Sequence, residues 1–218
     1  MPSSLPLKHY VLTLPQKRMK SLLAIIFLAA VLLGAWWLFF KTEKTVSQPK
    51  QESIKLGKHT PEFNQSISDA ISAYIVMKDA FVDADTFKVK SEGQKFIVTI
   101  DSVKLEDLQK YDAQVLMAAR QEISDIKANA VAMLQENNIT EMRQDFRMVS
   151  ENLYPFLKTI GYEGQKLYWQ NCPMAFGEDK EGNWLSITKE IINPYLGKNH
   201  PEFKSSMLNC GETKDTLK

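Results

Sequence analysis

Apolar side chains recur every three or four residues through the middle of the chain, the spacing that places them on one face of an α-helix. The stretch 67–81 shows this spacing, and "SISD" at 66–69 offers residues that can cap a helix. The pattern is clearest over 105–137, and it returns over 139–160, where Gly161 is a typical helix end. These three stretches predict three helices.

The stretch 83–103 is ambiguous. Phe96, Ile97, Ile100 and Val103 keep a helical spacing, whereas Gly93 and the run "FIVTI" favour a strand. We expect a helix there. Four helical segments joined by short polar breaks predict an antiparallel four-helix bundle.

The pattern changes after residue 160. The range 161–211 holds six glycines and three prolines, and only short apolar runs such as "KLYWQ" and "NWLSI" lie between them. This composition predicts a loop-rich cap, residues 161–218, with room for a short hairpin. The expected fold class is therefore mainly α.

The range 21–40 is apolar and carries no charge over about 20 residues, enough for one helix across a bilayer. Lys17, Arg18 and Lys20 precede it and favour a cytoplasmic N-terminus. We expect an uncleaved signal-anchor; a cleaved signal peptide and a buried soluble helix are the alternatives. "MKSLLAI" also suggests that translation starts at Met19.

The predicted organisation has five parts. Residues 1–20 are a cytoplasmic N-terminus, 21–40 a transmembrane helix, 41–62 a polar linker, 63–160 the bundle and 161–218 the cap of the same domain. The protein would then be a single-pass membrane protein, with its C-terminal domain outside the cytoplasm.

Charge and motifs exclude several functions. The formal net charge is +1 and no basic stripe is present, so we expect no nucleic-acid partner. The chain contains none of the G-x-S-x-G, P-loop or H-E-x-x-H motifs. We therefore expect a protein that is not an enzyme.

The two cysteines of the chain each have a methionine nearby, as Cys172-Pro-Met174 and Met207-x-x-Cys210. Thiolates and thioethers are soft donors that suit Cu(I) or Ag(I). The same cysteines could instead form a disulfide in an oxidising compartment, worth about 3–4 kcal/mol. A soft-metal site, a disulfide and two unpaired thiols are all compatible with the spacing.

The cap also carries a resemblance. "CPMA" (172–175), "WLS" (184–186), "NPYLG" (193–197) and "MLNCG" (207–211) resemble the signature of a bacterial domain family of unknown function. That family also occurs attached to adaptor subunits of copper/silver efflux systems. The residues that match, besides the four sulfur-bearing ones, are Pro173, Trp184, Asn193, Pro194, Tyr195, Gly197 and Gly211.

The resemblance implies a helical bundle outside the cytoplasm with a link to heavy-metal handling. The inserted segment 198–206 departs from the family pattern and adds His200 as a further candidate ligand. We therefore expect a membrane-tethered domain that binds or relays Cu(I) or Ag(I) through Cys172, Met174, Met207 and Cys210. Its partner would be a metal-efflux or another envelope protein. The alternative is a structural or interaction module with a Cys172–Cys210 disulfide and no metal.

Overall fold

The computed structural model describes residues 27–34, 36 and 58–218. The chain divides into two units, 1–53 and 54–218. In the first, residues 27–34 are helical. None of the helices in the described part of the chain has both the length and the apolar character needed to cross a membrane. The predicted span 21–40 extends beyond the described residues, and the predictions for 1–20 and 41–57 lie outside them.

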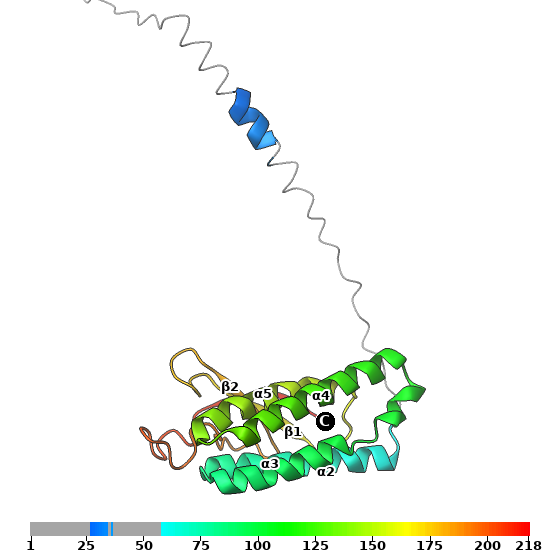
Figure 1. The fold of residues 1–218 in the computed structure, drawn as a ribbon, viewed down its shortest axis with the longest axis vertical. Coiled ribbons are helices and arrows are strands. Elements are labelled where there is room, and N and C mark those ends of the chain that lie inside the picture. Colours follow the sequence, from blue (N-terminus) through cyan, green and yellow to red (C-terminus); the bar gives the residue numbers. More distant parts are fainter. Residues whose placement is uncertain (1–26, 35, 37–57) are drawn as a thin grey trace, which may run out of the picture. The chain divides into compact units, whose positions relative to one another are not determined.

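The second unit is built mainly of helices. They are α2 (Pro61–Val82), α3 (Thr86–Asp101), the 3-10 helix η1 (Leu105–Lys110), α4 (Ala113–Gln135) and α5 (Ile139–Thr159). Helix α2 packs on α3, α3 on α4 and α4 on α5 (Figure 1). The prediction of a mainly helical fold is confirmed.

Each of the four α-helices begins at a polar residue whose side chain accepts a hydrogen bond from a backbone N–H of the first turn. These residues are Thr60, Asp85, Asp112 and Asn138. Such caps satisfy amide groups that have no partner inside the helix. They fix where each helix starts, and two of these starts differ from the predicted boundaries.

The first correction concerns the linker. Helix α2 starts at Pro61, and His59 is buried, so residues 58–62 belong to the folded domain and not to the linker. The second concerns 105–137, which is not one helix. Residues Leu105–Lys110 form η1, and α4 starts at Ala113 because Asp112 caps a new helix.

Gly93 lies inside α3 and explains why that stretch looked ambiguous. A Cβ atom at this position would come within 2.7 Å of Met133 Cε and 2.9 Å of Leu134 Cδ2 on α4. Glycine thus leaves room here for the ends of two side chains of α4. It does not mark a strand, and the prediction of a helix over this stretch is confirmed.

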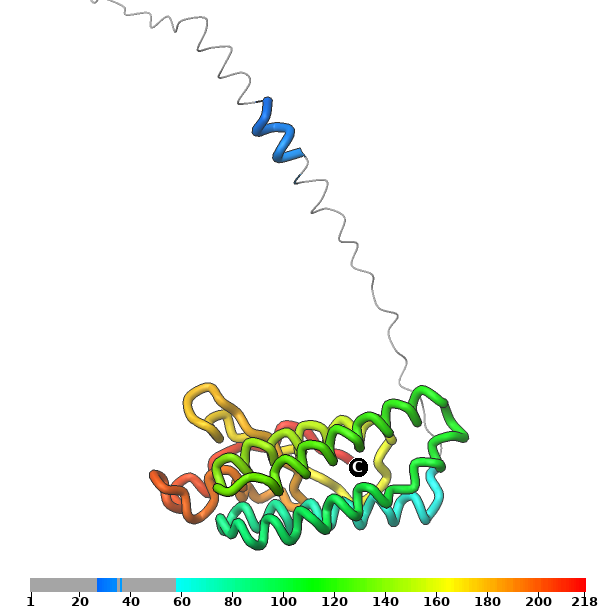
Figure 2. The backbone as a smooth tube through the Cα atoms, viewed as in Figure 1, coloured from blue at the N-terminus to red at the C-terminus, as the bar shows by residue number. Residues whose placement is uncertain are grey.

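A small antiparallel sheet follows the helices. It consists of β1 (Leu167–Cys172), β2 (Gly182–Ser186) and β3 (Glu212–Leu217), in the order β2-β1-β3. Strands β1 and β2 are the predicted hairpin. Strand β3 was not predicted, because its sequence "ETKDTL" is polar and exposed. The loops drawn in orange gather at one end of the bundle, away from the start of α2 (Figure 2).

The sheet and helices share one core. The hydroxyl of Tyr74 on α2 lies 2.7 Å from Ser150 Oγ on α5 and accepts a hydrogen bond from Leu185 N on β2 at 3.2 Å. The ring of Phe146 on α5 lies 5.8 Å from that of Tyr195 in the cap. The cap is thus packed on the bundle and is held in a fixed position.

Candidate functional site

The two cysteines lie against each other. Their Sγ atoms are 2.7 Å apart, although 38 positions separate them in sequence. Both are free cysteines, since their separation is longer than the S–S bond of about 2.05 Å. Cys172 is buried and Cys210 is partly exposed, so the pair (hereafter the thiol pair) can be reached from solvent at Cys210.

The sheet brings the thiol pair together. Strand β1 ends at Cys172, and its neighbour Asn171 pairs with Glu212 at the start of β3. Cys210 lies two residues before that strand, in a turn where its N–H donates to the carbonyl of Met207 at 3.0 Å. The antiparallel pairing of β1 with β3 therefore places the two thiols side by side.

Gly211 is required by the same arrangement. Its φ angle is +139°, and a Cβ there would lie 2.6 Å from the carbonyl oxygen of Asn171 and 3.1 Å from the ring of Trp184. Only glycine fits a backbone of this kind at such a distance. The "CG" of "MLNCG" thus lets Cys210 approach Cys172.

Asn193 holds the turn that carries Cys210. Its side chain donates to the carbonyl of Cys210 at 2.9 Å and accepts from the N–H groups of Tyr195 and Leu196 at 2.8 and 3.0 Å. Its own N–H donates to the carbonyl of Leu208 at 2.8 Å. The asparagine of "NPYLG" is fully buried and is the residue that joins two of the motif segments.

The protonation of the thiol pair follows from its surroundings. Burial, and after it the hydrogen bond with Cys172, raise the pKa of Cys210 to about 12. The Cys210 thiol is therefore protonated at neutral pH. An ion that binds this thiol must displace its proton, which makes the affinity depend on pH.

The other predicted ligands lie in two different places. Met207 begins the turn that ends at Cys210, and it packs against the hydrophobic core. Met174 is 46% exposed, and together with His200 it lines a separate cavity that neither cysteine lines. In the described part of the chain, no group of three or more His, Cys, Asp or Glu side chains could hold a metal ion.

That cavity, hereafter the Arg143 cavity, has a volume of about 290 Å³. It lies between the first turns of α5 and the cap. Its lining includes Thr140, Arg143, Gln144, Met174, His200 and Phe203.

Arg143 was not among the predicted site residues, and it is only 3% exposed. Its Nε donates to the carbonyl of Pro194 and its Nη2 to the carbonyl of Phe81, both at 3.1 Å. It therefore joins α2, α5 and the cap. Its burial could have been predicted from its position three residues before Phe146, which places it on the apolar face of α5.

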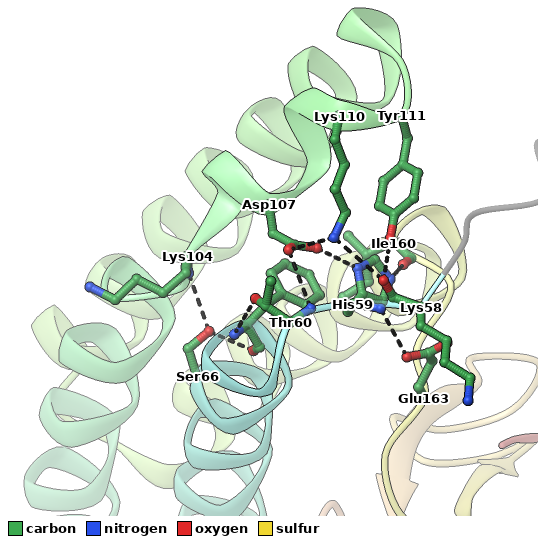
Figure 3. Close-up of polar contacts among 11 residues, drawn as sticks. Lys58, His59, Thr60, Ser66, Lys104, Asp107, Lys110, Tyr111, Ile160 and Glu163 are labelled. Atoms are coloured by element: carbon green, nitrogen blue, oxygen red, sulfur yellow. Dashed lines mark hydrogen bonds and ion pairs between the residues drawn. The ribbon is translucent and has the colours of Figure 1, made fainter.

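His59, which the predicted linker 41–62 included, is buried at the opposite end of the bundle. Its ring Nδ1 lies 2.8 Å from Asp107 Oδ2 and its Nε2 lies 2.7 Å from the carbonyl of Ile160 (Figure 3). Each ring nitrogen thus faces an oxygen that can accept a hydrogen bond. The sequence feature that could have predicted this position is "TP" at 60–61, a typical helix start, which places His59 directly before the first helix of the domain.

Asp107 on η1 is the centre of this second cluster. Besides His59, it accepts hydrogen bonds from Lys110 Nζ at 2.9 Å and from Thr60 N at 3.3 Å. Burial alone would raise the pKa of Asp107, but the hydrogen bonds from Lys110, His59 and Thr60 outweigh it and lower the pKa to about 2. The carboxylate thus holds His59 and Thr60, the residues directly before α2, against η1.

Comparison with known proteins identifies part of the chain. Residues 70–165 match the family described as "Protein of unknown function (DUF3347)". This supports the resemblance to a bacterial domain of unknown function over the helical part, and the match ends before β1, so it includes neither cysteine. No curated protein and no solved structure matches the chain.

Proposed function

We propose that this protein is a membrane-tethered domain that works outside the cytoplasm and binds or relays Cu(I) or Ag(I) through Cys172 and Cys210. The observation that supports the proposal is the contact of the two Sγ atoms at 2.7 Å. Two cysteines brought together from distant segments, one of them open to solvent, offer two soft donors to one ion. The membrane tether rests on the apolar range 21–40.

The donor set fits a soft ion of low coordination number. A metal–sulfur bond is about 2.3 Å long, so one ion between two thiolates needs sulfur atoms up to roughly 4.6 Å apart. The thiol pair must therefore open by up to roughly 2 Å when the ion enters. Cys210 is the cysteine that can move, because it lies in a turn, whereas Cys172 is the last residue of a central strand. Met207 begins that turn and is the candidate third ligand.

The partner we propose is a metal-efflux component or another protein of the envelope. This rests on the resemblance of "CPMA", "WLS", "NPYLG" and "MLNCG" to the family signature. We propose no catalytic activity for the domain.

A second candidate function is favoured by the same short distance. Thiols in contact outside the cytoplasm are placed to oxidise to a disulfide. The cross-link would then close a loop of 38 positions and fasten β1 to the turn before β3. In that case the domain is a structural or interaction module that binds no metal.

Titration of the full chain in detergent distinguishes the two. The reduced protein should bind about one Ag(I) or Cu(I) per chain in competition with a chromogenic chelator, and Cys172→Ser with Cys210→Ser should abolish binding. Met207→Ala should weaken binding if the thioether is a ligand. Met117→Ala, on the exposed face of α4, is the matched control and should have no effect.

The proposal fails if the reduced protein binds no ion. A second measurement then tests the alternative, a structural or interaction module with a disulfide. Thiol titration of the protein as isolated, without reductant, should find no free thiol if the disulfide is its functional state.

A further inference from the structure

Arg143 is a buried charge without a carboxylate beside it. Burial is the only cause that shifts its pKa, which it lowers to about 10, and Glu202, the acidic residue that lines the Arg143 cavity, does not contribute to the shift. Its hydrogen bonds go to two neutral backbone carbonyls, those of Pro194 and Phe81. A buried, uncompensated cation is costly, and the cost falls when an anion joins it.

The guanidinium has one nitrogen left for such an anion. Nε and Nη2 are occupied by the two carbonyls, and Arg143 lines the cavity of about 290 Å³. Nη1 is therefore the donor that the cavity can use. The hydroxyl of Thr140 and the amide of Gln144, on the same face of α5, line the same space and add neutral hydrogen-bonding groups.

The charges around the cavity favour an anion over a cation. The pKa of His200 is lowered, first by burial and then by the positive charge of Arg143. Lys204 acts on His200 in the same direction, and Glu202 is the one group that opposes them. The potential at His200 is therefore positive, which disfavours a metal ion held there by Met174 and His200.

Apart from Glu202, the remaining walls are mainly apolar. Met174, Phe176 and Phe203 line the cavity, and their side chains are all at least partly exposed. A volume near 290 Å³ is at the small end of the range for ligand pockets. It suits a molecule of the size of benzoate and is too small for a nucleotide or a peptide.

We propose that the Arg143 cavity binds a small organic carboxylate, with the carboxylate at Arg143 Nη1 and its apolar part against Met174 and Phe203. This site is separate from the thiol pair, since neither cysteine lines the cavity. It does not depend on whether the thiol pair binds a metal.

Methionine-methyl NMR on the full chain in detergent tests the proposal, with sodium benzoate as the probe. The methyl signal of Met174 should shift saturably at millimolar benzoate, while that of Met117, exposed on α4, should not move. Neutral benzamide should bind at least about tenfold more weakly, because it lacks the charge. The Cys172→Ser, Cys210→Ser protein should bind benzoate unchanged, which separates this site from the proposed metal function.

Two variants test the role of charge. Arg143→Lys should weaken benzoate binding about tenfold, since lysine cannot keep both carbonyl contacts and still reach the ligand. Because that variant also loses the contacts to α2 and the cap, Glu202→Gln provides an independent test. It removes the opposing charge and should tighten binding roughly two- to fivefold.

Three results would overturn the proposal. The first is the absence of a saturable Met174 shift up to about 100 mM benzoate, far above the millimolar affinity expected. The second is equal binding of benzamide and benzoate. The third is binding of inorganic phosphate as tight as that of benzoate, which would show that the apolar walls contribute nothing.

Discussion

Replacing Asp107 with asparagine tests whether the carboxylate cluster at His59 stabilises the domain. Asp107 accepts from His59, Lys110 and Thr60, and its side chain is 4% exposed. The asparagine keeps the size of the side chain and removes the charge. The entry of the chain into α2 should therefore loosen while the rest of the fold stays intact.

The size of the effect follows from the pKa of Asp107, which falls from an ordinary 3.8 to about 2. That difference of about 1.8 units corresponds to about 2.4 kcal/mol at 1.36 kcal/mol per unit. The ammonium of Lys110 belongs to a side chain that is 44% exposed, so solvent screens its share. We therefore expect Asp107→Asn to lower the free energy of unfolding by about 1–2 kcal/mol at pH 7.

The effect should also depend on pH, with a definite sign. Because the folded pKa of Asp107 is lowered, its stabilisation is fully present above the ordinary value of 3.8 and is lost as the pH falls towards about 2. The difference between wild type and Asp107→Asn should therefore be the same at pH 7 and pH 5, and should shrink below pH 4.

Urea unfolding of the full chain in mild detergent, followed by circular dichroism, measures both quantities. The matched control is Asp83→Asn, which removes an exposed ion pair with Lys198 and should change the free energy of unfolding by less than about 1 kcal/mol. A difference for Asp107→Asn that is absent at pH 7, or equally large at pH 3, would refute the reasoning.

Three further predictions concern packing and are measured in the same unfolding assay. Gly211→Ala should destabilise the domain by more than about 1 kcal/mol beyond Gly177→Ala, because both glycines have positive φ but only the first faces a carbonyl oxygen at 2.6 Å; equal effects would contradict the clash. Phe96→Ala should cost about 3–5 kcal/mol, since its ring is fully buried, whereas Phe87→Ala on the same helix, 84% exposed, should stay within about 0.5 kcal/mol; similar losses would contradict the described packing of α3. Tyr74→Phe should cost about 1–2 kcal/mol, because it removes the hydrogen-bond acceptor of the buried Leu185 N–H and one of the two partners of the Ser150 hydroxyl, and an unchanged midpoint would show that this link between bundle and sheet is not needed.

The helices were predictable because their information is local. The apolar spacing of α2, α4 and α5 is visible in any window of the sequence, and the polar residues at their starts follow known capping preferences. Two boundaries were missed. Helix α2 starts at Pro61, within the predicted linker. The division between η1 and α4 was missed because Leu105 and Leu108 continue the apolar face of the following helix by spacing alone. The role of Gly93 was ambiguous because it depends on a distant residue. The side chain that its Cβ position faces belongs to Met133, 40 residues further along the chain.

The candidate site was predictable in part. The residue types of "CPMA" and "MLNCG" pointed to soft-donor chemistry, and the spacing left a disulfide, a metal site and two thiols open. The contact of Cys172 with Cys210 depends on the pairing of β1 with β3, and β3 has no apolar pattern that predicts it. The separation of Met174 from the thiol pair was not visible in the sequence either.

By itself, the sequence determined the helical class, the positions of most helices and the set of residues that carry the chemistry, because periodicity, caps and residue types act over short ranges. The tertiary structure decided which of those residues meet. It placed the two thiols in contact, moved Met174 and His200 to the Arg143 cavity, and buried Arg143 and His59 among partners far away in sequence. Such contacts depend on how helices and strands pack, and packing is set by many distant side chains at once.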